Sequence, residues 1–443
     1  MPGIEMMHMR LTTVLALTAL LHTPAALAAD PPLVPASVKA DVAALTPKII
    51  AWRRDIHQHP ELGNRETRTA KLVADHLKKL GMEVQTGVAH TGVVAVLKGG
   101  KPGPVVALRA DMDALPVTEQ VDLPFASKVR TTYNGQDVGV MHACGHDGHV
   151  AILMGVAELL AKRRADLPGT VKFIFQPAEE GPPDGEEGGA ELMVKQGVLH
   201  TDPKPQAIFG LHLASAHHAG TIAYRPGPAM AAADMFKIVV QGRQAHGGRP
   251  WTGVDPLVTS AQILVGLQTI VSRNMEVIKE PAVVTVGALN GGVRSNIIPD
   301  KAEMVGTIRT FDEGMRREVH DRIRRVAENI AESAGATATV TIETGYPVTD
   351  NDRDLTAWAA PVLAQVAGPG KLVEGSKTTG AEDFSFFQQK IPGFFFWVGA
   401  TPANVPLDKV PSNHSPLFMV SESSLAIGAE AMASLTVTWL SSH

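Results

Sequence analysis

Four short apolar runs in the first half of the chain predict the strands of a buried sheet. They cover residues 92–97, 104–109, 171–176 and 207–213. Each run is continuous rather than alternating, and Gly or Pro punctuates the sequence around them, which is typical of strands covered on both faces. Segment 48–81 has apolar residues at helical spacing on both sides of Pro60, and residues 150–162 repeat that spacing. Helices between such strands favour an α/β domain.

The pattern changes near Ala231, where alternating residues replace the continuous apolar runs. Strands are predicted at 234–241, 282–289, 302–310 and 337–344, with helices at 255–271 and 313–333. This strand–helix–strand–strand–helix–strand order is that of a ferredoxin-like sandwich, which is complete in itself. Because apolar runs punctuated by Gly and Pro return after it, we expect a small α+β domain at 231–345. It would interrupt an α/β domain formed by residues 30–230 and 346–443.

Residues 1–28 are predicted to be a signal peptide. Arg10 precedes an apolar run from Leu11 to Leu21, and Ala26-Leu27-Ala28 has the small-x-small pattern of a signal-peptidase site. The apolar run is too short to span a bilayer. We therefore expect a periplasmic or secreted protein with no membrane attachment once the signal peptide is cleaved.

The net charge and the single cysteine limit which partners and which kinds of site we expect. The net charge is -5, and no basic stripe with interleaved aromatic residues is present, so nucleic acid is not an expected partner. About 415 residues would remain after cleavage, which is more than one hydrophobic core usually serves. Cys144 is the only cysteine, so no intramolecular disulfide can form. An exposed free thiol would be oxidised outside the cytoplasm, which favours a metal-bound thiolate.

The densest group of chemically active residues is the stretch His142–His149, which reads H-A-C-G-H-D-G-H. It places three histidines, one aspartate and the cysteine in eight positions, and Gly145 and Gly148 would let the backbone turn tightly between them. Thiolate and imidazole ligands suit zinc, nickel, cobalt or manganese better than calcium or magnesium. One such cluster supplies too few ligands, so further ligands must come from other segments.

Those further ligands are expected where the predicted strands end. Asp111 and Asp113 follow the second apolar run, Glu179 and Glu180 follow the third, and His212 lies at the end of the fourth. Open α/β sheets bind ligands at the carboxyl ends of their strands. Asp111 and Asp113 are candidates for ordering or ligating a metal. Of two adjacent carboxylates, one can bind a metal while its neighbour acts as a base.

Two later segments also carry candidate polar residues. His414 lies between turn-forming residues, where a side chain can be directed at a site. The loop Asp184–Gly189 is acidic and glycine-rich, and we expect it to be solvated.

Five motifs carry a family likeness, and they occur in the order expected for that family. They are R-D-I-H-Q-H-P-E-L around His57, R-A-D-M-D-A-L-P from Arg109, M-H-A-C-G-H-D-G-H from Met141, Q-P-A-E-E-G from Gln176 and G-L-H ending at His212. Together they resemble the hippurate hydrolase, aminoacylase and auxin-conjugate hydrolase group of two-metal amidohydrolases, which is related to bacterial metallocarboxypeptidases. The likeness spans residues 45–440. It implies a two-metal, aminopeptidase-like catalytic domain, mostly parallel with helices on both faces, and an inserted lid domain through which a homodimer or larger homo-oligomer would form.

The resemblance also implies a role for each matching residue. The implied metal ligands are Cys144, His146, Glu180, His212 and His414. Glu179 would be the general base, and Asp113 would orient a ligand. In the lid, His246 would help bind the substrate carbonyl, either within its own subunit or across a dimer interface. Asn296 and Arg309 would contact polar groups of the substrate.

The chain departs from the family pattern at two positions that could contact substrate. Trp251 follows Pro250 where a histidine is common, and the Asp184–Gly189 loop is longer than usual. Both departures bear on specificity rather than on the chemistry.

The expected activity is metal-dependent hydrolysis of the amide bond of N-acyl amino acids, or of small peptides with a free carboxylate. A metallocarboxypeptidase or dipeptidase of the same mechanism is the first alternative. A thiol hydrolase with Cys144 as nucleophile is a second, and an inactive periplasmic binding relative is a third. Two divalent ions are expected, and the ligand types leave zinc, manganese, nickel and cobalt open.

Overall fold

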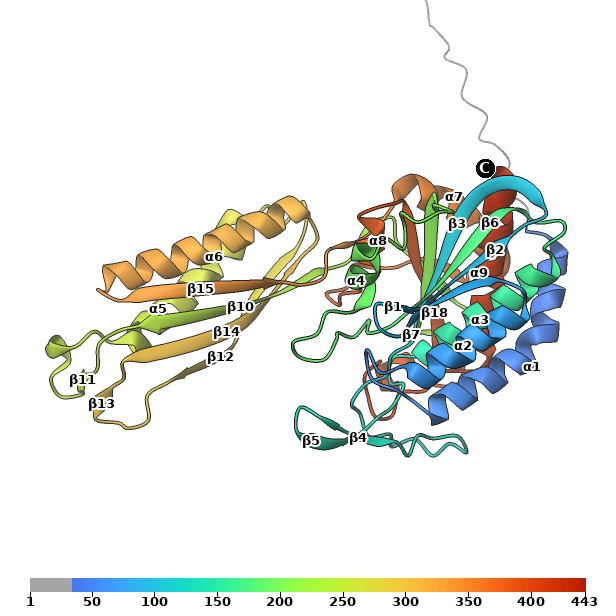
Figure 1. Ribbon diagram of the computed structural model, residues 1–443. Coiled ribbons are helices and arrows are strands. Elements are labelled where there is room, and N and C mark those ends of the chain that lie inside the picture. Colours follow the sequence, from blue (N-terminus) through green and yellow to red (C-terminus); the bar gives the residue numbers. More distant parts are fainter. Residues whose placement is uncertain (1–33) are drawn as a thin grey trace, which may run out of the picture. The chain divides into compact units, whose positions relative to one another are not determined.

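The computed structural model describes residues 34–443 of the chain, so the predicted signal peptide lies outside the described residues (Figure 1). An eight-stranded sheet forms the centre of the larger, α/β domain. Its spatial order is β1 (Glu83–Val88), β2 (Gly92–Lys98), β6 (Pro168–Gln176), β3 (Lys101–Asp111), β7 (Ala207–His218), β18 (Gly393–Thr401), β8 (Ile222–Tyr224) and β17 (Leu372–Glu374). Among these described residues, no helix combines the length and apolar character needed to cross a membrane.

The middle of the sheet is parallel, as predicted. Strands β6, β3, β7 and β18 run in one direction, whereas β1 and β2 pair antiparallel at one edge. Asp111 of β3 lies opposite Gln176 of β6, so the segments carrying Asp113 and Glu179 leave the sheet at the same edge. His212 of β7 lies opposite Trp397 of β18.

Helices cover both faces of the large sheet. One face packs against α1 (Ala36–Gln58), α2 (Thr67–Lys79), α3 (His146–Lys162), α7 (Arg353–Ala367) and α9 (Ser423–Ser442), and the other against α4 (Gly189–Lys195) and α8 (Ser385–Gln388). Val106 and Leu108 point into the first core and Ala107 into the second, since side chains alternate along a strand. Burial on both sides explains why the strands read as continuous apolar runs.

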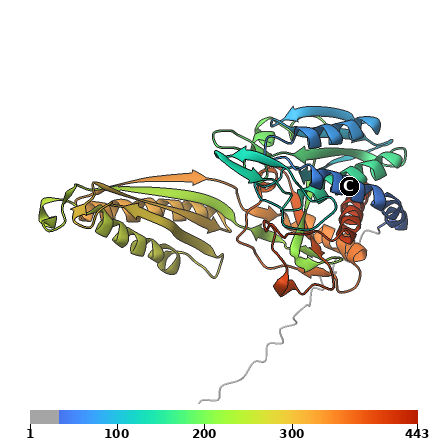
Figure 2. The ribbon, with the colours of Figure 1, turned by 90° about the horizontal axis from the view of Figure 1, so that it is seen from below.

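The inserted lid domain has the predicted ferredoxin-like order. Its elements are β10 (Ala232–Gln241), α5 (Pro256–Thr269), β12 (Ala282–Gly291), β14 (Lys301–Thr310), α6 (Glu313–Ser333) and β15 (Thr337–Thr344). The strands form an antiparallel sheet in the order β12-β14-β10-β15. Phe236, Ile238 and Val240 face α5 and α6, which lie on one side of this sheet (Figure 2). Helix α6 begins after Asp312, whose side chain accepts a hydrogen bond from the Met315 amide and so caps the helix.

Short elements complete the described chain. They are β4 (Arg130–Tyr133) with β5 (Gln136–Gly139), β9 (Gly227–Met230) with β16 (Thr349–Asn351), β11 (Ala245–His246) with β13 (Ile297–Ile298), the π-helical turn Ile270–Asn274, and the 3-10 turns Pro250–Thr252 and Leu407–Lys409. None of the paired short strands was predicted from the sequence. They lack the long apolar runs that identify the central strands.

Three sequence expectations around the histidine-rich stretch were wrong in detail. Helix α3 begins at His146 rather than at residue 150, so the second half of the stretch lies on its first turn. Gly145 does have a positive φ of 96°, but Gly148 is helical. A Cβ at Gly148 would lie 2.4 Å from Leu213 Cδ1, so this glycine permits close packing rather than a turn. Strand β7 does not end at His212 but continues to His218.

Candidate metal centre

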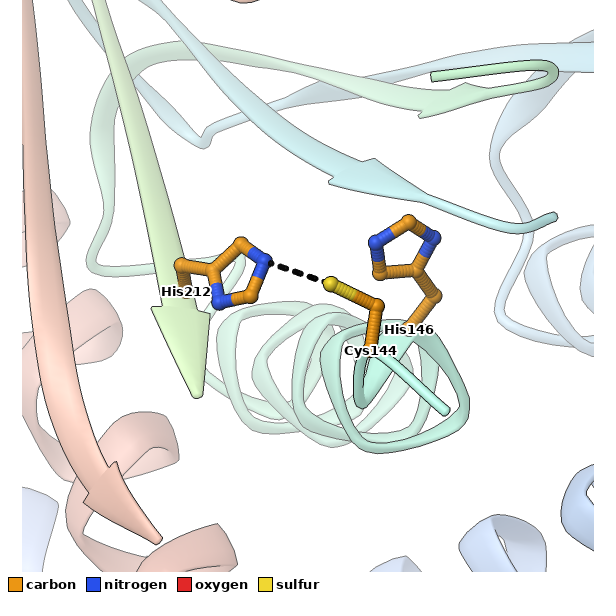
Figure 3. Close-up of side chains that lie close together, drawn as sticks. All are labelled: Cys144, His146 and His212. Carbon is orange, nitrogen blue, oxygen red and sulfur yellow. Dashed lines mark hydrogen bonds between the residues drawn. The ribbon is translucent and has the colours of Figure 1, made fainter. Parts of the chain in front are cut away.

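The start of α3 and the middle of β7 bring the first three candidate ligands together (Figure 3). Cys144 and His146 flank Gly145, whose left-handed backbone turns the chain into the helix. His212 projects from β7, and its Nε2 lies 3.3 Å from the Sγ of Cys144. Cys144, His146 and His212 offer three ligand atoms within 4.8 Å of one another.

Glu180 and His414 approach the same sulfur from two other segments. His414 Nε2 lies 3.3 Å from Cys144 Sγ and 2.9 Å from Glu180 Oε1. The backbone of His414 has a φ of 73°, and its amide donates to Ala143 O, which ties this loop to the segment before α3. All five residues implied as ligands thus converge. Five groups of three among the described residues could hold an ion, and the two that contain Cys144 together include all five implied ligands.

In two histidines, the Nδ1 atom is hydrogen-bonded, which leaves the Nε2 atom available to bind a metal. His146 Nδ1 lies 3.2 Å from Asp113 Oδ1, and among the described residues its buried Nε2 has no hydrogen-bond partner. His212 Nδ1 donates to Leu213 O over 2.9 Å, so its Nε2 faces Cys144 as an acceptor. A ligating histidine normally donates its other ring nitrogen to a carboxylate or carbonyl in this way. The residues present therefore fit a metal ion.

His149, on the same helix turn, provides the contrast. Its Nδ1 lies 2.6 Å from Asp111 Oδ1, and its Nε2 accepts from the Leu213 amide. Both ring nitrogens are used, so His149 supports the site rather than ligating. Asp111 in turn receives a hydrogen bond from Arg109 over 2.6 Å, which makes it an ordering residue rather than a ligand.

The electrostatics of this cluster favour positive charge. Hydrogen bonds to Cys144 and Glu180 raise the pKa of His414 to about 10. Burial, followed by the charge of Glu180, raises the pKa of the Cys144 thiol. A nucleophilic cysteine needs the opposite shift, so the thiol-hydrolase alternative finds no support here.

Glu179 has the environment of a proton-transfer group. Burial, and then the carboxylates of Glu382 and Glu180, raise its pKa well above the ordinary value. Its Oε2 lies 3.8 Å from His146 Nε2, beside the ligand cluster. A carboxylate with a raised pKa can accept and return a proton near neutral pH.

The backbone turn that presents Glu179 and Glu180 is held from three sides. Ala178 has a φ of 49°, and its amide donates to Glu66 over 2.8 Å. The Glu180 amide donates to Asp113 Oδ2 over 2.9 Å, and the Tyr346 hydroxyl donates to Glu179 O over 2.5 Å. Asp113 thus contacts both His146 and this turn, in keeping with the orienting role implied for it.

Sequence reasoning missed a buried group behind Glu179. Arg109 donates to Asp383 Oδ1 and lies 2.9 Å from Glu382 Oε1, and all three side chains are buried. Gln176 donates to both carboxylate oxygens of Asp383. The adjacent acids in T-G-A-E-D-F were the available signal, but a pair of acids in a loop is more often solvated. Glu66 was also missed, because a glutamate is more often solvated than buried.

The loop Asp184–Gly189 is largely exposed, as expected, with only Gly189 buried, and two contacts hold it in place. Glu186 accepts hydrogen bonds from Arg65 Nη2 over 2.5 Å and from Asn64 Nδ2 over 3.1 Å. Gly189 begins α4 and its position packs against Asp383, since a Cβ there would lie 2.5 Å from Asp383 Oδ2. This ion pair and packing fix the loop.

The lid residues implied in substrate binding take part in hydrogen bonds within the lid itself. His246 and Asn296 are neighbours on the β11–β13 pair, where the Gly247 amide donates to Asn296 O, and both are exposed. Arg309 lies near the other end of the lid sheet, opposite Ala233. Within residues 34–443, no hydrogen bond or ion pair joins these three side chains to the predicted ligands. Trp251 is 77% exposed.

A family comparison decides the chemistry of this centre. The family described as Peptidase family M20/M25/M40 matches residues 107–438. The chain belongs to this family. It is therefore a metal-dependent amidohydrolase, as the motifs predicted.

Individual relatives cover almost the whole chain of this M20-family protein. It is 43% identical to thermostable carboxypeptidase 1 of Saccharolobus solfataricus over 402 residues, which are 90% of this chain and 97% of the relative. It is 41% identical to N-acetylcysteine deacetylase of Bacillus subtilis over 391 residues, 88% and 96% of the two chains. A crystal structure of the YXEP protein of Bacillus subtilis, described as a dinuclear metal-binding peptidase, aligns with a TM-score of 0.76 and 38% identity, covering 90% of this chain and 99% of that one.

Proposed function

We propose that this protein hydrolyses the amide bond of N-acyl amino acids, or of small peptides with a free carboxylate, at a centre of two divalent metal ions. The observation that carries the proposal is the convergence of five candidate ligands on one buried thiol, with Glu179 beside them. The ions would be held by Cys144, His146, Glu180, His212 and His414, with Cys144 shared. Zinc, manganese, nickel and cobalt all suit this mixture of ligands.

When bound, the ions would polarise the amide carbonyl and lower the pKa of water toward neutrality. Glu179 then takes the proton from the attacking water and returns it to the leaving amine. Asp113 keeps His146 Nε2 and the Glu180 carboxylate directed at the centre, because its two oxygens contact His146 Nδ1 and the Glu180 amide.

The lid supplies the groups that recognise substrate. Arg309 grips the free carboxylate at two points, since a guanidinium matches a carboxylate geometrically. His246 stabilises the oxygen of the reacting carbonyl, and Asn296 contacts a polar group of the substrate. Along β14, Arg309 lies eight residues from Lys301, which pairs with the end of β10 that leads to His246; this is roughly 26 Å at about 3.3 Å per residue. One small substrate cannot span that distance, so we infer a homodimer in which two subunits contribute to each site.

The names of the relatives support two versions of this activity. One relative is named as a deacetylase of an N-acylated amino acid, and the other as a carboxypeptidase. Both reactions break an amide bond next to a free carboxylate, so the same centre serves either. The N-acyl amino acid version is the main proposal, and the carboxypeptidase or dipeptidase version is the alternative.

A substrate and metal panel tests the proposal. Hippurate, N-acetyl amino acids and dipeptides are offered to the mature protein before chelation, after chelation, and after each divalent metal is returned. Activity that disappears with chelator and returns with metal is the expected result. Activity that survives complete metal removal, measured by elemental analysis, would overturn the metal mechanism, and the substrate profile separates the two versions.

Glu179→Ala tests the assignment of the base. We expect turnover to fall by roughly 10²- to 10⁴-fold, because a positioned general base contributes about that much, while metal content stays at the wild-type value. Asp75→Ala, an exposed acid on α2, is the control and should keep full activity. Loss of metal with activity retained would contradict the assignment.

From the predicted signal peptide we propose that this activity takes place in the periplasm or outside the cell. Sequencing the amino terminus of protein recovered from the exported fraction tests this placement, with cleavage after Ala28 expected. Full-length protein found only inside the cell would refute it.

A further inference from the structure

The turn from Ala178 to Glu180 carries the proposed base and one of the predicted ligands, but only the ligand is held through its side chain. Glu180 Oε1 lies 2.9 Å from His414 Nε2, whereas no group of the described chain donates a hydrogen bond to the Glu179 carboxylate. Its ion-pair contact with His146 Nε2 is long, at 3.8 Å. The direction of the Glu179 side chain therefore depends on the backbone that carries it.

That backbone has a conformation that alanine rarely adopts. Ala178 has a φ of 49°, in the left-handed region where the Cβ crowds the following carbonyl. The residue is fully buried, and its carbonyl accepts from the Gly181 amide over 3.3 Å, which closes the turn. A turn of this kind persists only where the surrounding structure holds it, and such turns are concentrated at active sites.

Glu66 holds the amide at the start of the turn. It immediately precedes α2, it is fully buried, and its Oε1 accepts from the Ala178 amide over 2.8 Å. Its Oε2 accepts from the Thr91 hydroxyl over 2.5 Å, so the carboxyl group is fixed at both oxygens. Thr91 lies between β1 and β2, which ties this anchor to the edge of the large sheet.

Tyr346 holds the carbonyl in the middle of the turn. Its hydroxyl donates to Glu179 O over 2.5 Å, and its ring meets Phe386 edge-on with 6.1 Å between the ring centroids. The backbone is fixed as well, because Tyr346 O accepts from the Ala233 amide over 3.0 Å and from Arg316 over 3.3 Å. Ring and backbone together keep the hydroxyl beside the turn.

The third support of the turn has a different task. Asp113 accepts from the Glu180 amide and contacts the imidazole of His146, so it serves the ligands. In the part of the chain that the structure describes, no hydrogen bond joins Glu66 or Tyr346 to the side chain of a predicted ligand. These two residues act on the part of the turn that carries the base.

We propose that Glu66 and Tyr346 are positioning residues for the general base, because they fix two of the peptide groups from which the Glu179 carboxylate is directed toward the ligand cluster. The inference rests on the proposed function, since it takes Glu179 as the base. Proton transfer needs the carboxylate within hydrogen-bond reach of the attacking water, so a shift of about 1 Å can lower the rate by about 100-fold. Loss of either anchor should therefore lower kcat and leave the metal content unchanged.

Tyr346→Phe removes the hydroxyl and keeps the ring. We expect kcat on the best substrate of the panel to fall roughly 10- to 100-fold, with KM and metal content at the wild-type values. Tyr224→Phe, the same substitution in β8, is the matched control and should leave all three quantities unchanged. Loss of metal from Tyr346→Phe, or a wild-type kcat, would overturn the role given to Tyr346.

Glu66 is tested with a conservative and a non-conservative variant. Glu66→Gln keeps an oxygen that can accept from the Ala178 amide, so it should keep most of the wild-type kcat. Glu66→Ala leaves that buried amide without a partner and should lower kcat as much as Tyr346→Phe does. If Glu66→Gln is as impaired as Glu66→Ala, the hydrogen bond is not what Glu66 contributes, and its role as an anchor is wrong.

A double variant shows whether the effect passes through Glu179. In a Glu179→Ala background the base is absent, so Tyr346→Phe should change the residual kcat by less than about twofold. If the full loss persists in this background, Tyr346 acts on something other than the base and the proposal is wrong.

Failure of this inference is distinguishable from failure of the proposed function. A metal-loaded wild-type enzyme that is inactive on the whole panel would overturn the proposed function and the positioning roles with it. An active wild type whose kcat is unchanged by Tyr346→Phe and by Glu66→Ala would overturn the positioning roles alone.

Discussion

The cluster of candidate metal ligands and the lid residues proposed to bind substrate are built in opposite ways. His146 is fully buried, and its ring contacts Asp113, a residue from the segment that follows β3. His246 is exposed, and its ring only accepts a hydrogen bond from the Gly248 amide two residues away. The first arrangement is formed by residues of one chain, whereas in the proposed function the second acts only when another surface meets it.

The difference follows from what each group must bind. A metal ion needs several ligand atoms at fixed separations, which buried side chains with second hydrogen-bond partners provide. A substrate must enter and leave, so groups that contact it lie on exposed and separable surfaces. Variants in the two regions should therefore fail in different ways: variants of the cluster lose metal, and variants of the lid lose substrate affinity or rate.

The largest difference is expected between His146→Ala and His246→Ala. The first removes a ligand from the buried cluster, so we expect both the metal content and the activity to fall, the activity by at least about a thousandfold. The second should lower activity but keep the full metal content, because no described contact links His246 to the ligands. Elemental analysis beside kcat measures both. Equal metal loss in the two variants would abolish the distinction between the regions.

A smaller effect is expected on the stability of the lid, which contains a buried ion pair. Arg316 donates to both oxygens of Asp234, and His320 also contacts this carboxylate over 2.7 Å. Asp234→Asn should lower the free energy of unfolding at pH 7 by about 3 kcal/mol, because it removes the buried carboxylate of the pair and leaves Arg316 with only the half-exposed Glu313 as an acidic partner. Hydrogen exchange of the amides of β10 and α6 reports this. Glu303→Gln, which removes the exposed pair with Lys237, should change stability by less than about 0.5 kcal/mol.

The contribution of Asp234 to the stability of the lid should change with pH in a defined direction. Burial disfavours the charged form of Asp234, but hydrogen bonds from Arg316 and His320 outweigh it and lower the pKa to about 2. The folded-state pKa lies below the unfolded value of about 3.9, so the contribution is complete above pH 4 and is lost as the pH falls toward 2. The difference between wild type and Asp234→Asn should shrink over that range. A difference that stays constant down to pH 2 would show that the pair acts through packing alone.

The sequence was most informative where local pattern alone determines structure. Helix α6 has the predicted bounds, and β15 does too, because amphipathic spacing and an Asp cap mark their limits. The ligand types were recognisable because a thiol and two imidazoles at such short spacing rarely occur for other reasons. The sequence did not reveal that α3 begins at His146, since Gly148 reads as a turn until Leu213 is seen packed against it.

Contacts between distant segments could not be predicted. Glu66 lies 112 positions from the Ala178 amide that it accepts from, and Arg109 lies 274 positions from Asp383. No local signal distinguishes such buried carboxylates from solvated ones, because their burial depends on how the sheet and its loops assemble. The same limit explains why the β4–β5 hairpin was missed, for its residues are almost all exposed and lack an apolar face.

The smallest effect is expected from Arg309→Ala, and it tests whether the exposed lid supplies the carboxylate site. Losing a charge-assisted hydrogen-bond pair costs about 2 kcal/mol, so KM for N-acyl amino acids should rise roughly 30-fold with kcat little changed. Arg309→Lys should recover only part of the loss, since an ammonium group cannot grip two oxygens at once. The matched control is the carboxamide of the same substrate, for which wild type and Arg309→Ala should have the same KM. If the variant loses affinity equally for the carboxylate and the carboxamide, Arg309 supports the lid sheet through its contact with Ile308 O and does not bind the substrate carboxylate.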